Sequence, residues 1–291
     1  MRSLATLSAF VCASAVAQTT PWQRADGLAG GYVACADDRA FHVRTHQLGL
    51  EIQVWNGTAW SETPPPALAL PRRQPRTLQP PVATPDGRLL FAYTGRILAW
   101  DGWEWTSYQA PPGAKALWAP AANHVYAVGA HSITMLQPVD DRIAFVPYRA
   151  PTWISLSGIG GASPEELWIG SADGGLFRHR EGQWESHPLG VREEIRSVHV
   201  ADDTWALTSE GRLFRFDDEW REERDLPGQV AAIGGVTTHI VGSFGIARRT
   251  QGAWAVEDPL GGVAIEDASV CTTDHHVIAS ATAGTWVRER E

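Results

Sequence analysis

The sequence has almost no lysine, few cysteines and no long hydrophobic run beyond its first residues. Lys115 is the only lysine among 24 basic residues, and 33 acidic residues give a formal net charge of −9. This balance disfavours nucleic acid and anionic membrane surfaces as partners, because phosphate groups attract positive charge. No later segment holds about 18 consecutive apolar residues, so we expect no membrane insertion of the mature chain.

Motifs of the common catalytic and cofactor-binding classes are also missing. There is no nucleophile elbow, because Gly242-Ser243-Phe244-Gly245 has the wrong spacing, and there is no Walker loop or dinucleotide fingerprint. The densest metal-ligand cluster is Asp274, His275 and His276, but neighbouring residues of a strand face opposite sides and cannot readily share an ion. We therefore expect no catalytic residues, no cofactor and no metal, and hence no enzyme.

The first residues have the features of an export signal. Arg2 precedes an apolar run from about Leu4 to Val16, and Ala15 and Ala17 provide the small residues that a signal peptidase accepts. This run is too short for a permanent membrane helix, which needs about 20 residues. The sequence predicts a signal peptide at 1–17, cleavage after Ala17, and a periplasmic or extracellular protein of one domain at 18–291.

The 14 tryptophans are the most informative residues that are present. Many of them follow a turn of the Asn-Gly or Asp-Gly kind, which suits a two-residue β-hairpin. With Phe145 in one gap, this aromatic position recurs at intervals of 45, 40, 39, 36 and 34 residues. The series is Trp60, Trp105, Phe145, Trp184, Trp220 and Trp254.

A second signal lies upstream in each unit, as a short hydrophobic strand that ends in a small residue. Seven such strands occur at a mean spacing of about 39 residues, the period of a four-stranded propeller blade. The equivalent positions in these strands are taken as Phe41, Leu90, Tyr126, Trp168, Trp205, Ile240 and Val277. The chain is therefore predicted to be an all-β, seven-bladed β-propeller.

The two ends predict how the ring closes. The seventh unit stops one strand short, at TWVRERE, and the segment around Trp22 aligns with the strand that carries Trp220. We expect the N-terminal strand to complete the last blade in a velcro closure that removes both sheet edges. The first and last blades then meet at a seam that contains Cys35 and Cys271, where either a disulfide or two buried free thiols fits.

One blade carries a clear resemblance. The segment EELWIGSADGGLFRHREGQW at 165–184 resembles the propeller repeat of bacterial two-component regulators and, more broadly, YVTN-like and WD40-like repeats. It is also similar to the tryptophan-rich repeats of large secreted bacterial proteins. The resemblance implies a fold more than a function, because such repeats serve as sensors, scaffolds and protein-binding modules. Ser171, Asp173 and Gly175 match half of a sialidase Asp-box, but we interpret them as a glycine-rich turn.

The segment 61–81 departs from the repeat and is the best candidate for a contact surface. It holds seven prolines and three arginines, Arg72, Arg73 and Arg76. Proline predicts an extended loop, and a loop between blades lies on the propeller face that usually binds ligands. An arginine cluster there would suit an acidic partner, although a tolerated surface insertion explains the segment as well.

These observations favour a monomeric, exported propeller that binds an unknown protein or small ligand on one face, as a scaffold or sensory module. The alternative is a propeller-fold enzyme, a glycoside hydrolase or lyase with carboxylates at the channel mouth. Such a site would be assembled from several blades, so no sequence motif can identify it.

Overall fold

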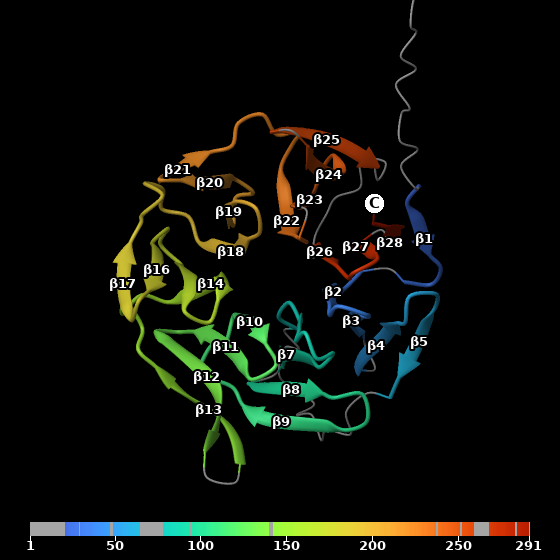
Figure 1. Ribbon diagram of the computed structural model, residues 1–291, viewed down its shortest axis with the longest axis horizontal. Coiled ribbons are helices and arrows are strands. Elements are labelled where there is room, and N and C mark those ends of the chain that lie inside the picture. Colours follow the sequence, from blue (N-terminus) through green and yellow to red (C-terminus); the bar gives the residue numbers. More distant parts are fainter. Residues whose placement is uncertain are drawn as a thin grey trace, which may run out of the picture.

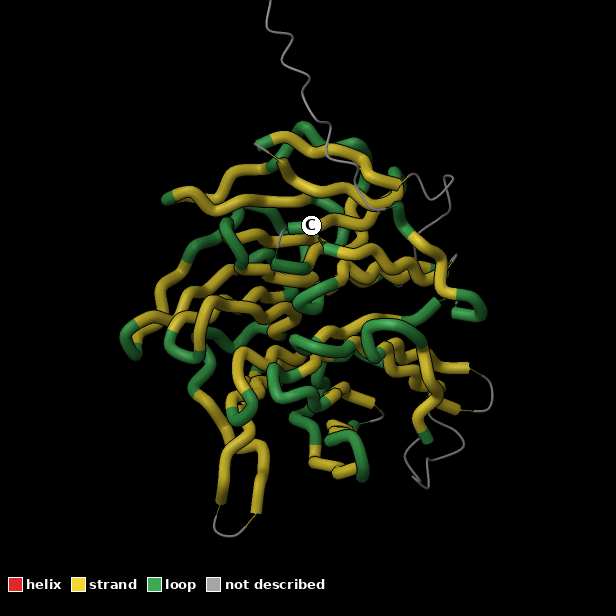
Figure 2. Tube along the Cα trace, turned by 45° about the vertical axis from the view of Figure 1, so that its right-hand side comes forward, coloured by secondary structure: helices red, strands yellow, loops and turns green. Residues whose placement is uncertain are grey.

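The computed structural model describes residues 21–28, 30–46, 49–64, 78–93, 95–139, 142–236, 238–250, 252–258, 268–282 and 284–290. Within this part of the chain the structure consists of strands and their connections, with no helix that could span a membrane (Figure 2). The signal peptide expected at 1–17 and the three arginines of the 61–81 segment lie outside the described residues.

The strands form seven antiparallel sheets of four strands, arranged as blades in a ring (Figure 1). This confirms the predicted seven-bladed β-propeller. Blade 1 comprises β2 (Tyr32–Cys35), β3 (Ala40–His46), β4 (Gly49–Trp55) and β5 (Trp60–Thr63). Blade 2 comprises β6 (Val82–Ala83), β7 (Leu89–Tyr93), β8 (Arg96–Trp100) and β9 (Trp105–Gln109). Blade 3 comprises β10 (Ala116–Ala121), β11 (His124–Gly129), β12 (Ser132–Val139) and β13 (Arg142–Tyr148).

The remaining blades follow in the same order around the ring. Blade 4 comprises β14 (Leu156–Ser163), β15 (Glu166–Ser171), β16 (Leu176–Arg180) and β17 (Gln183–Ser186). Blade 5 comprises β18 (Ile195–Val200), β19 (Thr204–Thr208), β20 (Leu213–Asp217) and β21 (Glu219–Glu222). Blade 6 comprises β22 (Val230–Gly234), β23 (His239–Gly242), β24 (Gly245–Thr250) and β25 (Ala253–Asp258).

Blade 7 combines the two ends of the described chain. Its strands are β26 (Ser269–Thr272), β27 (His276–Ala281), β28 (Gly284–Glu289) and β1 (Gln23–Ala25). β1 pairs antiparallel with β28, with Gln23 opposite Val287 and Ala25 opposite Thr285. The backbone groups on the outer edge of β28 are thereby paired with a strand that lies more than 250 residues away in the sequence.

The position of a strand in its blade decides how deeply it is buried. The first strand of each blade lies nearest the ring axis and the fourth lies at the rim (Figure 1). Second strands are sandwiched between two neighbouring blades, so all five residues of β7 are buried, whereas β17 at the rim is largely exposed. This explains why the second strands are the continuous hydrophobic segments in the sequence.

Seven apolar clusters fill the spaces between neighbouring blades. Six of them contain one residue each of the recurring aromatic series found in the sequence, and the seventh contains Trp22. Each of these aromatic residues belongs to the outer strand of its blade or, for Trp22, directly precedes it, and packs on the blade before. They are Trp60, Trp105, Phe145, Trp184, Trp220, Trp254 and Trp22. All seven are only partly buried.

The largest buried aromatics come from the second strands. Trp168 and Trp205 are 1% and 0% exposed, and they meet the outer-strand Trp220 and Trp254 at centroid distances of 5.4 and 5.6 Å. Edge-on aromatic pairs of this kind add to the stabilisation from burial. These pairs join blades 4 and 5 and blades 5 and 6 from the interior to the rim.

The sequence-based equivalence of the second strands is wrong by one residue in the last two blades. Phe41 and Leu90 face the following blade, whereas Ile240 and Val277 pack in the cluster shared with the preceding blade. Their neighbours Val241 and Ile278 are the true equivalents. A shift of one residue reverses the face of a strand, and small apolar residues on both sides leave this shift invisible in the sequence.

Candidate functional site

The inner strands carry a glycine-rich segment where blades 4 and 5 meet. A Cβ atom on Gly160 would lie 2.2 Å from the carbonyl oxygen of Val198, and one on Gly158 would lie 2.9 Å from that of Ile195. Glycine is therefore required for β14 to approach β18 this closely. Gly158 and Gly160 thus serve the packing of blade 4 against blade 5.

Side-chain contacts between inner strands continue around the ring. Ser157 donates from Oγ to the carbonyl oxygen of Ile195 at 2.9 Å, and His199 Nε2 lies 2.9 Å from the carbonyl oxygen of Gly235. At the seam, the Val33 amide donates to Ser269 Oγ at 2.7 Å. These contacts hold the inner wall in a fixed geometry, as a preformed binding site requires.

Cys35 and Cys271 form a disulfide across the seam between blades 1 and 7. The two residues pack in one cluster, with Cys35 on the face of β2 directed at blade 7 and Cys271 on the face of β26 directed at blade 1. This is one of the two arrangements that the sequence left open. The disulfide and the β1–β28 pairing both join blade 7 to residues near the start of the described chain.

Two cavities lie along the inner wall, one at each end. We call the face where the inner strands begin the upper face, and the face where they end the lower face. The upper cavity, of about 310 Å³, is lined by residues of blades 1, 3, 4 and 5 and of the chain just before blade 2: Tyr32, Gln79, Pro80, Lys115, Ser157, Glu194, Arg196 and Ser209. The lower cavity, of about 480 Å³, is lined mainly by blades 5, 6 and 7 and by Cys35.

The upper cavity is locally positive although the whole chain is acidic. Its charged lining residues are Lys115, Glu194 and Arg196. Lys115 Nζ lies 2.6 Å from Glu194 Oε1, in an ion pair that runs from blade 3 to blade 5, past blade 4. Arg196 is exposed, and its side chain makes no ion pair or hydrogen bond with any other residue that the structure describes. One guanidinium thus remains available to an anionic group.

The acidic residue next to Glu194 is occupied elsewhere. Glu193 accepts a hydrogen bond from Arg212 at 2.8 Å, and hydrogen bonds from Thr208 and Arg212 lower its pKa. Arg212 also binds Glu222 at 2.8 Å. Glu193 is thus engaged with Arg212 and is not among the residues that line the upper cavity.

The C-terminal end of the 61–81 segment, which the sequence predicts to be a contact surface, lies at the upper cavity. Gln79 and Pro80, near its C-terminal end, are part of the cavity lining. The backbone amide of Gln79 donates a hydrogen bond to the carbonyl oxygen of Ala92. Arg72, Arg73 and Arg76 lie outside the described residues.

The lower cavity differs in character. Its wall includes the disulfide, the exposed Val236, His199 and Asp202. Burial lowers the pKa of His199 to about 4, so its imidazole is neutral at physiological pH. The carboxylates that line the two cavities within the described residues, Glu194 above and Asp202 below, are therefore at opposite ends of the inner wall.

The other sequence candidates are accounted for by local structure. Ser171 donates to Asp173 at 2.6 Å within the turn after β15. Asp274 and His275 lie in the turn between β26 and β27, and His276 begins β27. The described residues contain no group of three His, Cys, Asp or Glu side chains that could hold a metal ion.

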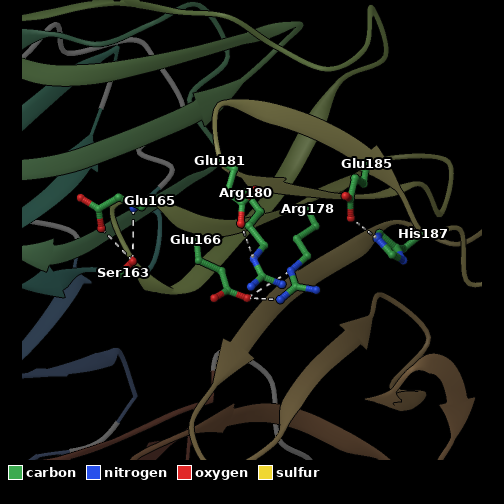
Figure 3. A network of polar contacts seen from close by, with 8 residues as sticks. All are labelled: Ser163, Glu165, Glu166, Arg178, Arg180, Glu181, Glu185 and His187. Carbon is green, nitrogen blue, oxygen red and sulfur yellow. Dashed lines mark hydrogen bonds and ion pairs between the residues drawn. The ribbon is translucent and has the colours of Figure 1, made fainter.

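Charged residues on blade 4 form a separate network, part of which lines a third cavity of about 310 Å³ apart from the two on the inner wall. Figure 3 shows Arg178 directed at Glu166, Arg180 beside Glu181, and His187 beside Glu185. Arg178 also lies over the ring of Trp168 at 5.3 Å. These charges neutralise one another on the blade surface, so we do not assign a ligand site to them.

The sequence did not predict the cavity or the roles of Arg196 and Lys115 in it. Lys115 is the only lysine in the chain, and this rarity was the single available signal. The cavity is lined by chain segments that are far apart in the sequence, so no local pattern marks it.

No protein-family model matches the chain, and no curated protein sequence matches it. Solved structures do match. The virginiamycin B lyase of Staphylococcus aureus aligns over 93% of this chain and 98% of its own, with a TM-score of 0.70 and 14% identity. YCF48 bound to the D1 peptide aligns over 94% and 96%, with a TM-score of 0.68 and 12% identity. The WD40 propeller domain of Doa1 aligns over 94% and 97%, with a TM-score of 0.71 and 12% identity. Identities this low show the fold alone, and the fold that the chain shares with these neighbours is the β-propeller, here with seven blades.

Proposed function

We propose that this chain is an exported, non-catalytic β-propeller that binds a protein or small ligand at its upper face, as a monomeric recognition or sensory scaffold. The observation that carries the proposal is the upper cavity, where Arg196 has no partner among the described residues within a rigid wall built from several blades. Binding residues on a fixed scaffold are typical of propellers.

The disulfide supports export to the periplasm or beyond. Stable disulfides form in oxidising compartments and are rare in the cytosol of most organisms. The Cys35–Cys271 bond therefore fits the export signal expected at 1–17. Two independent parts of the chain point to one compartment.

The separation of carboxylates favours binding over glycoside hydrolysis. Most glycosidases need two carboxylates within about 5–9.5 Å of each other at one site. On the inner wall, Glu194 lines the upper cavity in an ion pair with Lys115, and Asp202 lines the lower one. Glu181 and Glu185 share the cavity on blade 4, but both are exposed at the rim and each has a basic neighbour, Arg180 or His187. The alternative is a lyase at the lower cavity, where a neutral His199 lies near Asp202 and could accept a proton.

The structural neighbours include examples of both functions, catalysis and binding. One is described as a lyase and another as bound to a peptide. The peptide-bound neighbour fits the binding proposal, because it is a propeller of nearly the same length with a polypeptide ligand.

A selection experiment tests the binding proposal. A random peptide library displayed with free C-termini is selected on the purified mature protein, on a Lys115→Ala/Arg196→Ala variant and on a Val236→Ser variant of the lower cavity. We expect enrichment on the wild type and the Val236 variant and loss on the double variant. Absence of enrichment on the wild type, or equal loss with the lower-cavity variant, would contradict the proposal.

Export has its own test. Residues 1–22 are fused to alkaline phosphatase, which becomes active only after it leaves the cytoplasm. We expect activity from this fusion and none from one in which Leu7 and Phe10 are replaced by Asp. An inactive wild-type fusion would contradict export.

A further inference from the structure

We infer that the upper cavity captures the free C-terminal carboxylate of a polypeptide, with Arg196 and Lys115 as its cations and Trp153 as the apolar contact for the residues before it. The inference rests on the proposed binding function and names its ligand class. It is argued from the charge, the size and the surroundings of the cavity.

The charge of the cavity selects an anion. Two cations, Lys115 and Arg196, face one carboxylate, Glu194, in a chain whose formal net charge is −9. Arg196 is exposed and without a partner among the described residues. An arginine guanidinium presents paired donors that match the two oxygens of a carboxylate.

The size of the cavity favours the C-terminal residue of a polypeptide ligand over a longer segment. Cavities that enclose a complete small ligand have volumes of about 300–1,000 Å³, and the upper cavity, at about 310 Å³, is at the lower limit. It suits a terminal residue with its carboxylate, while the preceding residues of the ligand lie on the upper face outside it. Capture of a C-terminal carboxylate is a recurrent mode of peptide recognition.

An exposed aromatic residue lies on the connection that leads into the cavity wall. Trp153 is 91% exposed, and the adjacent Ile154 is 39% exposed. They belong to the connection from β13 to β14, which crosses the upper face and leads to Ser157 in the cavity wall. The connection is held in place, because Trp184 donates to the carbonyl oxygen of Arg149 and the Ala172 amide donates to that of Ser155. A nearly fully exposed tryptophan on a fixed connection is the kind of residue that anchors partner chains.

In the cavity, Glu194 would compete with the carboxylate of a ligand for Lys115. Glu194 places its carboxylate 2.6 Å from Lys115 Nζ. A ligand carboxylate that enters would take over this cation as well as Arg196. Removal of the Glu194 charge should therefore strengthen binding, a result that general damage to the site would not produce.

The test uses two pools of synthetic octapeptides that are randomised at the last four positions and differ only in a free or an amidated C-terminus. Retention by the oxidised, mature protein is measured by equilibrium dialysis. We expect the free-acid pool to be retained roughly tenfold better than the amide pool, since one charge-assisted pairing is worth about that factor. Arg196→Ala should lower the free-acid pool to the level of the amide pool, and Glu194→Gln should raise it.

The matched control is Arg180→Ala, which removes an exposed arginine from the β16–β17 hairpin at the lower face. It should leave both pools unchanged. Trp153→Ser should weaken both pools alike, because its contact does not depend on the carboxylate. Thermal melting of each variant checks that the fold is intact.

The outcomes separate the two levels of the proposal. Equal retention of the two pools, or equal behaviour of the Arg196 and Arg180 variants, would overturn the carboxylate assignment while leaving peptide binding in place. Failure to retain either pool would overturn polypeptide binding at the upper face as well, the form of the proposed function on which this inference rests. Competition by acetate with the same affinity as the free-acid pool would make this a small-acid site and overturn the polypeptide assignment.

Discussion

Loss of the disulfide should destabilise the propeller strongly, because it closes a very long loop. The Cys35–Cys271 bond joins residues that are 236 positions apart. In the chain-entropy description, a cross-link over this length removes about 18 cal/mol/K from the unfolded state, or about 5.5 kcal/mol at 25 °C. Measured effects are usually smaller than this description predicts, so we expect a loss of about 3–5 kcal/mol for Cys35→Ser/Cys271→Ser.

Urea unfolding measures this loss directly. With a urea dependence of about 3 kcal/mol per M for a chain of this size, the midpoint should fall by about 1–2 M. The urea dependence should also be steeper in the variant, because its unfolded state is not cross-linked and exposes more surface. The β1–β28 pairing does not replace the disulfide here, since it exists only in the folded state.

Reduction of the wild type serves as the matching experiment. A reductant should move the wild type to the midpoint of the variant and leave the variant itself unchanged, since the third cysteine, Cys12, lies within the expected signal peptide. Alkylation of the unreduced protein followed by mass measurement should add no label. Two labelled cysteines, or midpoints of variant and wild type that coincide, would refute the reasoning.

Three further predictions concern stability. Trp168→Ala should cost about 3–5 kcal/mol, because Trp168 is 1% exposed, whereas the partly buried Trp184→Ala should cost clearly less; equal midpoints in urea would contradict this order. Gly160→Ala should cost about 2 kcal/mol or more in urea unfolding, because its Cβ would lie 2.2 Å from a backbone oxygen, and a neutral result would mean that β14 and β18 can separate freely. Burial holds the pKa of His199 at about 4, below its ordinary value of 6.5, so the unfolded state binds more protons between these pH values and stability falls as the pH is lowered through this window. Wild type should lose up to about 3 kcal/mol more than His199→Gln between pH 6.5 and 4, and parallel pH profiles would contradict the shift.

The fold was predictable because its signals are local and repeated. Hairpin turns, buried second strands and rim aromatics such as Trp105 and Trp220 recur in each blade and show a spacing that only a few folds share. Register was predictable only where large residues mark one face, as Trp168 and Trp205 do. In blades 6 and 7 the small apolar runs around Ile240 and Val277 give no such mark, and the assignment there was wrong by one residue.

The candidate site was not predictable in the same way. The contact surface expected at the Pro-rich segment stays a prediction, and of that segment Gln79 and Pro80 line the upper cavity. The available arginine, however, is Arg196 on an inner strand. Nothing in the segment around it, GVREEIRSVHV, separates Arg196 from Arg192 or predicts that Glu194 is bound to Lys115 from another blade.

The sequence by itself determined the number of blades and the order of strands within them, because each blade is a local unit whose turns and alternating side chains are encoded within about 40 residues. Tertiary structure alone decided the pairing of Cys35 with Cys271, the ion pair of Lys115 with Glu194 and the partnerless state of Arg196 among the described residues. The physical reason is distance along the chain. Closure of the ring brings together side chains that are far apart in the sequence, such as those of Cys35 and Cys271, which are 236 residues apart. Their charges and thiols interact only after the blades have taken their places.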